Sequence, residues 1–362
     1  MKRILPCAVA LVVAGATISS AQDREPQLIE SSRLLVEGGG RVDFGPRGEL
    51  LAFDKPDADG RHDIFVLDLE TFGERCISCK VYDLRKSSNF NPAWQPSGDH
   101  VVFQSQTSPR RLRIDALEMT TPNRGVHSDL WIMRTDAKDF YRLTRAAEAG
   151  SAVLDPHFSY EGDRLIWTER ATSRGRGFGE WRLQNATLKT RRGIAALKKS
   201  RKYVPGKGVM IAHGFSPDER SVLLSGNLNS QSERGTDVYL LDLETEDLTR
   251  LTHTSRSRES IAHFTANGRQ ILFTAERPID PLLEREASNQ QLLLPGTEIW
   301  LMNLDGTDKR QVTTFFDDHG RVTIGDFSVS PDGTNVAVQL VFGGEEPRQA
   351  IYLLRTAPEL HR

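Results

Sequence analysis

Cysteine is scarce in this sequence, and an excess of charge of one sign is missing. Only three cysteines occur among 362 residues, too few for a disulfide framework. The formal net charge is -2, so no overall field attracts nucleic acid or an anionic membrane. Outside the N-terminus no apolar run approaches the roughly 20 residues that span a bilayer. These absences exclude disulfide-rich, nucleic-acid-binding and membrane-spanning classes of protein.

The N-terminus has the pattern of an export signal. A short basic segment at residues 1–3 precedes an apolar stretch at residues 4–18, and small residues end at Ala21. Cys7 lies too early in the apolar stretch to be a lipoprotein cysteine. We therefore expect cleavage near Ala21 and a mature chain that is periplasmic or secreted.

One motif recurs six times, and internal repeats of this length indicate a ring or solenoid. Each copy has an aromatic or apolar anchor, a turn that usually ends in glycine, and a β-rich run, as in WQPSGDHVVF and VSPDGTNVAV. The anchors are Phe44, Trp94, Phe158, Phe215, Phe264 and Val329.

Further strands follow each turn. A third strand begins with an acidic residue in four copies, as in TDVYLLDLE, and a short run such as TRLTH supplies a fourth. Because Asp63, Asp129, Asp237 and Glu298 recur, we interpret them as scaffold residues that accept backbone hydrogen bonds where the third strand begins. In the third copy WRLQNATLK is the candidate third strand, and no segment has the signature of a fourth.

The pattern predicts an all-β fold, a single six-bladed β-propeller of four-stranded blades at residues 41–356. The last blade lacks a fourth strand, and IESSRLLVE at residues 29–37 can supply it and close the ring. The expected segments are a signal peptide at 1–21, an N-terminal segment at 22–40, a C-terminal tail at 357–362, and blades near 41–88, 89–149, 150–207, 208–256, 257–318 and 319–356.

The FSPDG-like turns, the acidic residue before an aromatic strand, and the R-L-T ends resemble the TolB-like (WD40-like) propeller repeat. The resemblance implies a propeller. TolB carries an α/β domain before its propeller, and because only about 20 mature residues precede the first blade here, we do not expect that domain. The resemblance also implies a periplasmic scaffold that binds protein partners. No G-x-S-x-G motif is present, so the hydrolase domain of prolyl oligopeptidase-like enzymes is not expected.

Residues that break a repeat are candidates for function. His157 and His263 directly precede their anchors, and His213 lies two residues before its own. Innermost strands line a propeller's channel, so these imidazoles could bind a metal ion there, as histidines do in the related oligogalacturonate lyases. The alternative is that each packs or bonds within the scaffold. Asn91, Asp155 and Asp326 fall at nearby inner-strand positions.

Two other features interrupt the repeat. Cys76 and Cys79 form a C-x-x-C pair at the end of an outer strand, which favours a local disulfide if the strand turns there. Residues 170–207 contain 12 Lys or Arg and one acid, Glu180, which indicates either a solvated face or a docking patch for an acidic partner. The insertions at 104–127 and 275–295 are expected to be rim loops.

Two functions remain open on the sequence. The first is an exported scaffold, without a cofactor, whose channel mouth and rim loops bind an envelope or secreted protein. The second is a metal-dependent lyase or hydrolase acting on an anionic oligosaccharide, with His157, His213 and His263 as ligands. We expect the first, since no catalytic residue set can be placed from the sequence.

Overall fold

The computed structural model describes most of the chain after the predicted signal peptide. The described residues are 28–84, 87–107, 127–149, 151–172, 180–228, 235–254, 257–276, 296–320, 322–343 and 348–360. The signal peptide, most of both long insertions and residues 173–179 of the basic run lie outside this set. No helix among the described residues is long and apolar enough to cross a membrane.

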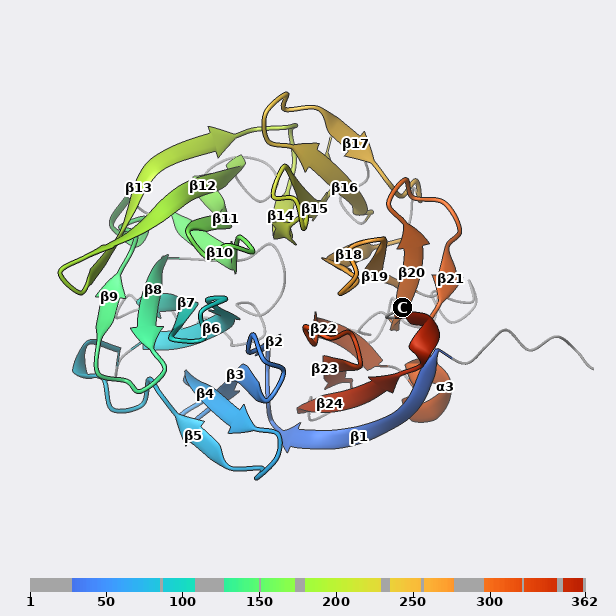
Figure 1. The fold of residues 1–362 in the computed structure, drawn as a ribbon, viewed down its shortest axis with the longest axis horizontal. Helices are drawn as coiled ribbons and strands as arrows, with labels where there is room; N and C mark the ends of the chain where they lie inside the picture. The colour runs from blue at the N-terminus through green and yellow to red at the C-terminus, as the bar shows by residue number, and fades with distance from the viewer. Residues whose placement is uncertain are drawn as a thin grey trace, which may run out of the picture.

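Six antiparallel sheets of four strands each stand in a ring around a central channel (Figure 1). This confirms the predicted six-bladed propeller. From the channel outward, the blades are β2 (Val42–Phe44), β3 (Leu50–Pro56), β4 (His62–Asp68) and β5 (Glu74–Cys76); β6 (Ser87–Trp94), β7 (His100–Thr107), β8 (Ser128–Arg134) and β9 (Phe140–Arg142); β10 (Ala152–Phe158), β11 (Arg164–Thr172), β12 (Glu180–Arg191) and β13 (Ile194–Tyr203); β14 (Met210–Phe215), β15 (Ser221–Gly226), β16 (Asp237–Asp242) and β17 (Leu248–Arg250); β18 (Glu259–Phe264), β19 (Gln270–Glu276), β20 (Thr297–Asn303) and β21 (Arg310–Gln311); and β22 (Val322–Val329), β23 (Asn335–Phe342), β24 (Arg348–Thr356) and β1 (Ile29–Glu37).

The helical segments among the described residues are short. They are the α-helix α3 (Phe315–His319) and the 3-10 turns η1 (Tyr82–Leu84), η2 (Ala147–Ala149) and η3 (Pro358–Leu360).

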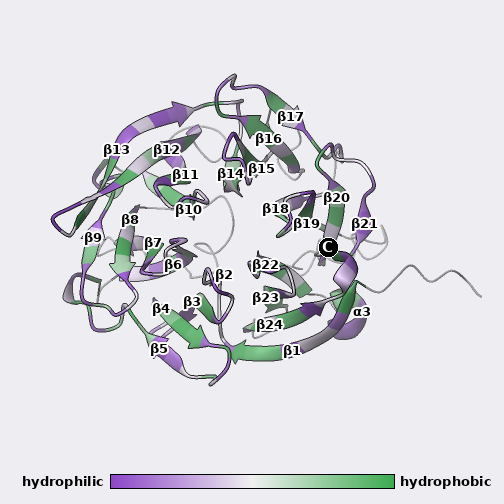
Figure 2. Cartoon of the chain, viewed as in Figure 1, coloured by the Kyte–Doolittle hydropathy of each residue, from purple (hydrophilic) through white to green (hydrophobic). Residues whose placement is uncertain are grey.

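The hydrophobic core lies between blades rather than within them. One cluster joins Phe53 of the first blade to Ala337 and Ile351 of the sixth. Another joins Ile64 of the first blade to Phe103 of the second. Figure 2 shows the hydrophobic residues concentrated on the strands. Because each face is buried only by a neighbour, the ring must close for every blade to be covered.

The ring closes through the first strand of the chain. β1 pairs antiparallel with β24, from Ile29 opposite Thr356 to Glu37 opposite Ala350. The closing strand has the bounds predicted from the sequence. It completes a blade whose other three strands come from the C-terminal end, and Val36 of β1 is buried in the core.

The tight turns explain the recurring glycine. Gly333, for example, has a φ of 74°, a conformation that glycine adopts without steric cost. In the fourth blade Glu219 takes this position with a φ of 57°.

The recurring acidic residues hold the third and fourth strands together. In each case a hydroxyl 15 positions later donates to the carboxylate: Ser78 to Asp63 (2.5 Å), Thr144 to Asp129 (2.9 Å), Thr252 to Asp237 (3.2 Å) and Thr313 to Glu298 (2.6 Å). The same hydroxyl accepts the backbone N–H that follows the acid, at 2.9 Å in all four blades. This acid–hydroxyl clasp agrees with the predicted scaffold role of the acids. It corrects the predicted donors, because a side-chain hydroxyl donates in all four blades where backbone N–H groups alone were expected.

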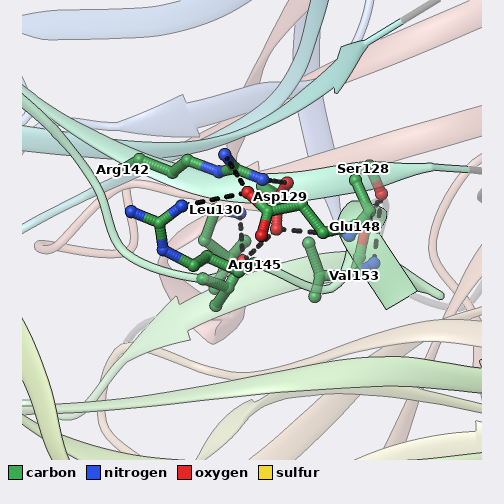
Figure 3. A network of polar contacts seen from close by, with 9 residues as sticks. Ser128, Asp129, Leu130, Arg142, Arg145, Glu148 and Val153 are labelled. Atoms are coloured by element: carbon green, nitrogen blue, oxygen red, sulfur yellow. Dashed lines mark hydrogen bonds and ion pairs between the residues drawn. The ribbon is translucent and has the colours of Figure 1, made fainter. Parts of the chain in front are cut away.

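Arginine completes the clasp in two blades. Arg142 Nη2 lies 2.7 Å from Asp129 Oδ2, and Arg250 Nη2 lies 2.7 Å from Asp237 Oδ2. Figure 3 shows Arg142 and Asp129 with their neighbours Arg145 and Glu148. The arginine of the R-L-T sequence is therefore a structural residue.

The third blade has all four strands, including a fourth strand that could not be identified from the sequence. Its fourth strand is β13, which pairs with β12 across a two-residue turn at Arg192 and Gly193. Both turn residues have positive φ, as the twist of a tight hairpin requires. β13 contains no R-L-T sequence, so the motif could not identify it.

Candidate functional site

A small polar cavity lies in the central channel, and all six blades contribute to it. Its volume is about 40 Å³, enough for roughly two or three water molecules or the end of one side chain. All six inner-strand residues singled out from the sequence line it: Asn91, Asp155, His157, His213, His263 and Asp326.

β-Bulges aim several of these side chains into the channel. Five of the six inner strands lose register at this level, for example between Phe90 and Ala93 and between Leu154 and His157. Asn91 and Asp155 sit in these bulges with φ values of 53° and 46°. Asn and Asp tolerate this left-handed region better than most residues, and bulges often re-aim side chains at functional sites.

A buried ion pair crosses the channel. Arg41 Nη1 lies 2.8 Å from Asp155 Oδ1, and the two side chains are only 10% and 7% exposed. Arg41 is fixed at its own backbone, because its N–H donates to Asp54 Oδ2 at 3.1 Å. Burial raises the pKa of Asp155, and the charge of Arg41 works in the opposite direction.

Two further carboxyl groups in the cavity have raised pKa values. Burial raises the pKa of Asp326 to about 7 and that of Asp43 to about 6. Asp326 accepts from the backbone N–H of Val42 (3.1 Å), and Asp43 accepts from that of Trp94 (2.7 Å). These contacts bridge neighbouring blades, so the titration of both groups is coupled to the closed ring.

The three histidines are neutral at physiological pH. Burial lowers the pKa of His157 to about 4 and that of His263 to about 3, and holds that of His213 well below its usual value. His213 Nε2 lies 2.8 Å from Ser225 Oγ. The centroid of the His263 ring lies 4.8 Å from the centroid of the Phe327 ring and 6.3 Å from that of the His157 ring.

The histidines do not form a compact set of metal ligands. In the described part of the chain, one group of three potential ligands has its ligand atoms all within 4.8 Å, and it is Asp63, Cys76 and Cys79. Those two cysteines are joined by a disulfide. The ligand atoms of the three channel histidines are not all within that distance of one another, although the three side chains line the same cavity.

The disulfide lies at the outer edge of the first blade, far along the sheet from the channel strand. β5 ends at Cys76, and the following turn lets Cys79 reach it with a Cα–Cα distance of 5.9 Å. Cys76 stands 13 residues after Asp63, where arginine stands in the second and fourth blades.

Sequence reasoning missed Arg41 and Asp43, which also line the cavity. Their positions relative to the repeat's anchor residue could have identified both. Arg41 lies three residues before the anchor Phe44, as Asn91, Asp155 and Asp326 lie before theirs, and Asp43 precedes its anchor as His157 and His263 do.

No protein-family model matches this sequence, and no curated protein matches it. Solved structures match its fold. TolB from Acinetobacter baumannii superposes with a TM-score of 0.55 at 13% identity, over 87% of this chain and 65% of that one. The chain thus spans a little under two thirds of that protein.

Two other structures match along most of their length. The putative TolB from Agrobacterium tumefaciens gives a TM-score of 0.55 at 13% identity, over 89% of this chain and 91% of that one. An oligogalacturonate lyase in complex with manganese gives 0.51 at 11% identity, over 91% and 94%. At such low identity these matches establish the fold alone. The chain therefore has the fold of a TolB-like, six-bladed β-propeller.

Proposed function

We propose that this protein is an exported binding scaffold that engages another protein at the mouth of its channel. The observation that carries the proposal is the channel cavity, built by all six blades from residues that break the repeat. The cavity presents an arginine, three carboxyl groups and neutral imidazoles, a set suited to hydrogen bonding with the end of a partner's side chain.

Volume and charge favour a protein over an anionic saccharide. About 40 Å³ is far below the several hundred Å³ of a typical small-molecule pocket. The single arginine of the cavity is already paired with Asp155, so an anionic sugar entering the channel would have to compete with that carboxylate. The apolar and polar rim of a propeller can instead provide the larger area that protein recognition needs.

Export is part of the same proposal. It rests on the basic, apolar and small-residue segments that end at Ala21. The lyase alternative stays a prediction. Its support is the fold shared with oligogalacturonate lyase, while the separation of the three histidines counts against it.

A matched pair of double variants tests the scaffold. Arg41→Gln with Asp155→Asn removes the buried ion pair without leaving a lone charge, and Arg134→Gln with Asp136→Asn removes an exposed pair in the second blade. Proteins captured from periplasmic extract are quantified by mass spectrometry, and thermal melting checks that each variant folds.

We expect a partner that wild type and the Arg134/Asp136 variant enrich equally and that a folded Arg41/Asp155 variant loses about tenfold or more. Equal enrichment by a folded Arg41/Asp155 variant would rule out the channel as the binding site.

A further inference from the structure

The β12–β13 hairpin of the third blade departs from four of the other blades. Its outer strand β13 has 10 residues, whereas β5, β9 and β17 have 3 and β21 has 2; only the closing strand β1 of the sixth blade is similarly long, with 9. The hairpin lies on the outer wall of the ring (Figure 1). The extra length is therefore not required by the propeller fold.

Figure 2 shows that much of this hairpin is hydrophilic, and basic residues supply most of its exposed charge. The exposed basic residues are Lys189, Arg191, Arg192, Lys198, Lys199, Arg201 and Lys202. Glu180 is the one acid between residues 180 and 203. Arg201 is paired with Glu246 of the fourth blade at 2.8 Å. The remaining charge gives this face a strongly positive potential in a chain whose net charge is -2.

The hairpin is also held rigidly. Ala195 and Leu188 pack against Ile132 of the second blade. At the other end of β13, the hydroxyl of Tyr203 donates to the carbonyl of Leu243 in the fourth blade. An edge that is already ordered loses little conformational entropy when it binds a partner.

The outer edge of β13 is open among the described residues. The strand order of the sheet ends at β13, which pairs with β12 alone. Such an edge presents N–H and C=O groups to an added strand. Lysines on an edge repel a second copy of the same strand, so they prevent self-association. The same lysines attract a strand that carries the opposite charge.

We propose that β13 is a docking strand for an acidic, extended polypeptide segment, which adds to the third blade as a fifth strand. Backbone hydrogen bonds on either side of the bulge at Lys199 and Ser200 supply the pairing, and the basic side chains select an acidic sequence. This surface lies on the outer wall, so the inference stands apart from binding at the channel.

The test uses the full mature protein and a fluorescent ten-residue peptide of alternating glutamate and threonine. A second peptide has the same sequence and charge but is N-methylated at alternate residues, which removes backbone donors. The protein variants are Lys198→Glu with Lys202→Glu on β13, and Arg47→Glu with Arg269→Glu as an exposed control with the same change in charge. Binding is measured by fluorescence anisotropy, and binding to phosphatidylglycerol vesicles is measured in parallel.

We expect wild type and the Arg47/Arg269 control to bind the unmethylated peptide within about twofold of each other, and the Lys198/Lys202 variant to bind about tenfold more weakly. The N-methylated peptide should also bind about tenfold more weakly. Equal binding of the two peptides would overturn the inference, because charge alone would then suffice. Equal binding by the Lys198/Lys202 variant would overturn it, as would binding to vesicles without binding to the peptide.

Discussion

Arg41 and Asp155 form an ion pair across the channel, with Nη1 and Oδ1 2.8 Å apart although 114 residues separate them in the sequence. The pair joins the first blade to the third, which are not neighbours in the ring. It therefore links blades that share no core cluster and fixes the charge at the centre of the cavity.

Breaking this pair on one side should be costly. We expect Arg41→Gln alone to lower the free energy of unfolding by about 3–5 kcal/mol, because it leaves the buried charge of Asp155 without its partner. Asp155→Asn alone should cost less, because Asp326 and Asp54 still act on Arg41. The double variant should lose much less than the sum. Urea unfolding of all four proteins measures the coupling, and additive losses would show that the two side chains do not interact.

The acid–hydroxyl clasp makes a second prediction. Thr144→Val removes the donor to Asp129 and the acceptor for the N–H of Leu130, so it should cost about 1–3 kcal/mol. Thr190→Val, at an exposed position of β12, should stay within about 0.5 kcal/mol of wild type. If the two variants are equally stable by urea unfolding, the clasp contributes nothing measurable.

Closure of the ring can be tested by removing the strand that completes it. Deletion of residues 28–37 removes β1 and exposes the edge of β24, so it should lower the melting temperature by about 10 °C or more. Leu34→Ala, at a side chain that is 45% exposed, should change it little. A deletion variant as stable as the full chain would contradict closure by β1.

The raised pKa of Asp326 predicts an unusual dependence of stability on pH. Between about pH 4 and pH 7 the folded protein keeps a proton that the unfolded chain releases, so this group makes the fold less stable as pH rises. Asparagine resembles the protonated acid. Asp326→Asn should therefore match wild type near pH 4 and gain up to about 4 kcal/mol relative to it at pH 8.

Asp242→Asn provides a control of opposite sign. The backbone N–H of Thr245 donates to Asp242 and lowers its pKa, so this carboxylate stabilises the fold above its unfolded pKa and loses that effect as pH falls. The Asp242 variant should be the less stable protein at pH 8. A difference between Asp326→Asn and wild type that does not vary with pH would show that Asp326 titrates normally.

The sequence predicted the ring well because the repeat recurs in register. The turn with its glycine, the acid of the third strand and the short fourth-strand run such as TRLTH each report the same local structure in several blades. β1 could be assigned to the last blade because that blade lacked a strand. β13 escaped detection because its lysine-rich sequence has neither the R-L-T motif nor a regular alternation of apolar residues.

The channel was only partly predictable. The positions of Asn91 and the three histidines on inner strands predicted that they line the channel, and all four line its cavity. Arg41 was overlooked, because a basic residue is not expected in a buried centre. The distances between the imidazoles depend on bulges such as the one between Ala212 and Gly214. A bulge shifts a side chain by a full residue without leaving a regular sequence pattern, so convergence of the histidines could not be judged in advance.

Metal analysis of the mature protein tests most directly whether the channel is a binding site rather than a metal centre. The protein is purified without chelators and without a metal-binding tag, beside a His157→Ala/His213→Ala/His263→Ala variant. The account predicts no stoichiometric transition metal in either protein. About one equivalent of metal in wild type, lost from a variant that still folds, would contradict it and identify the histidines as ligands.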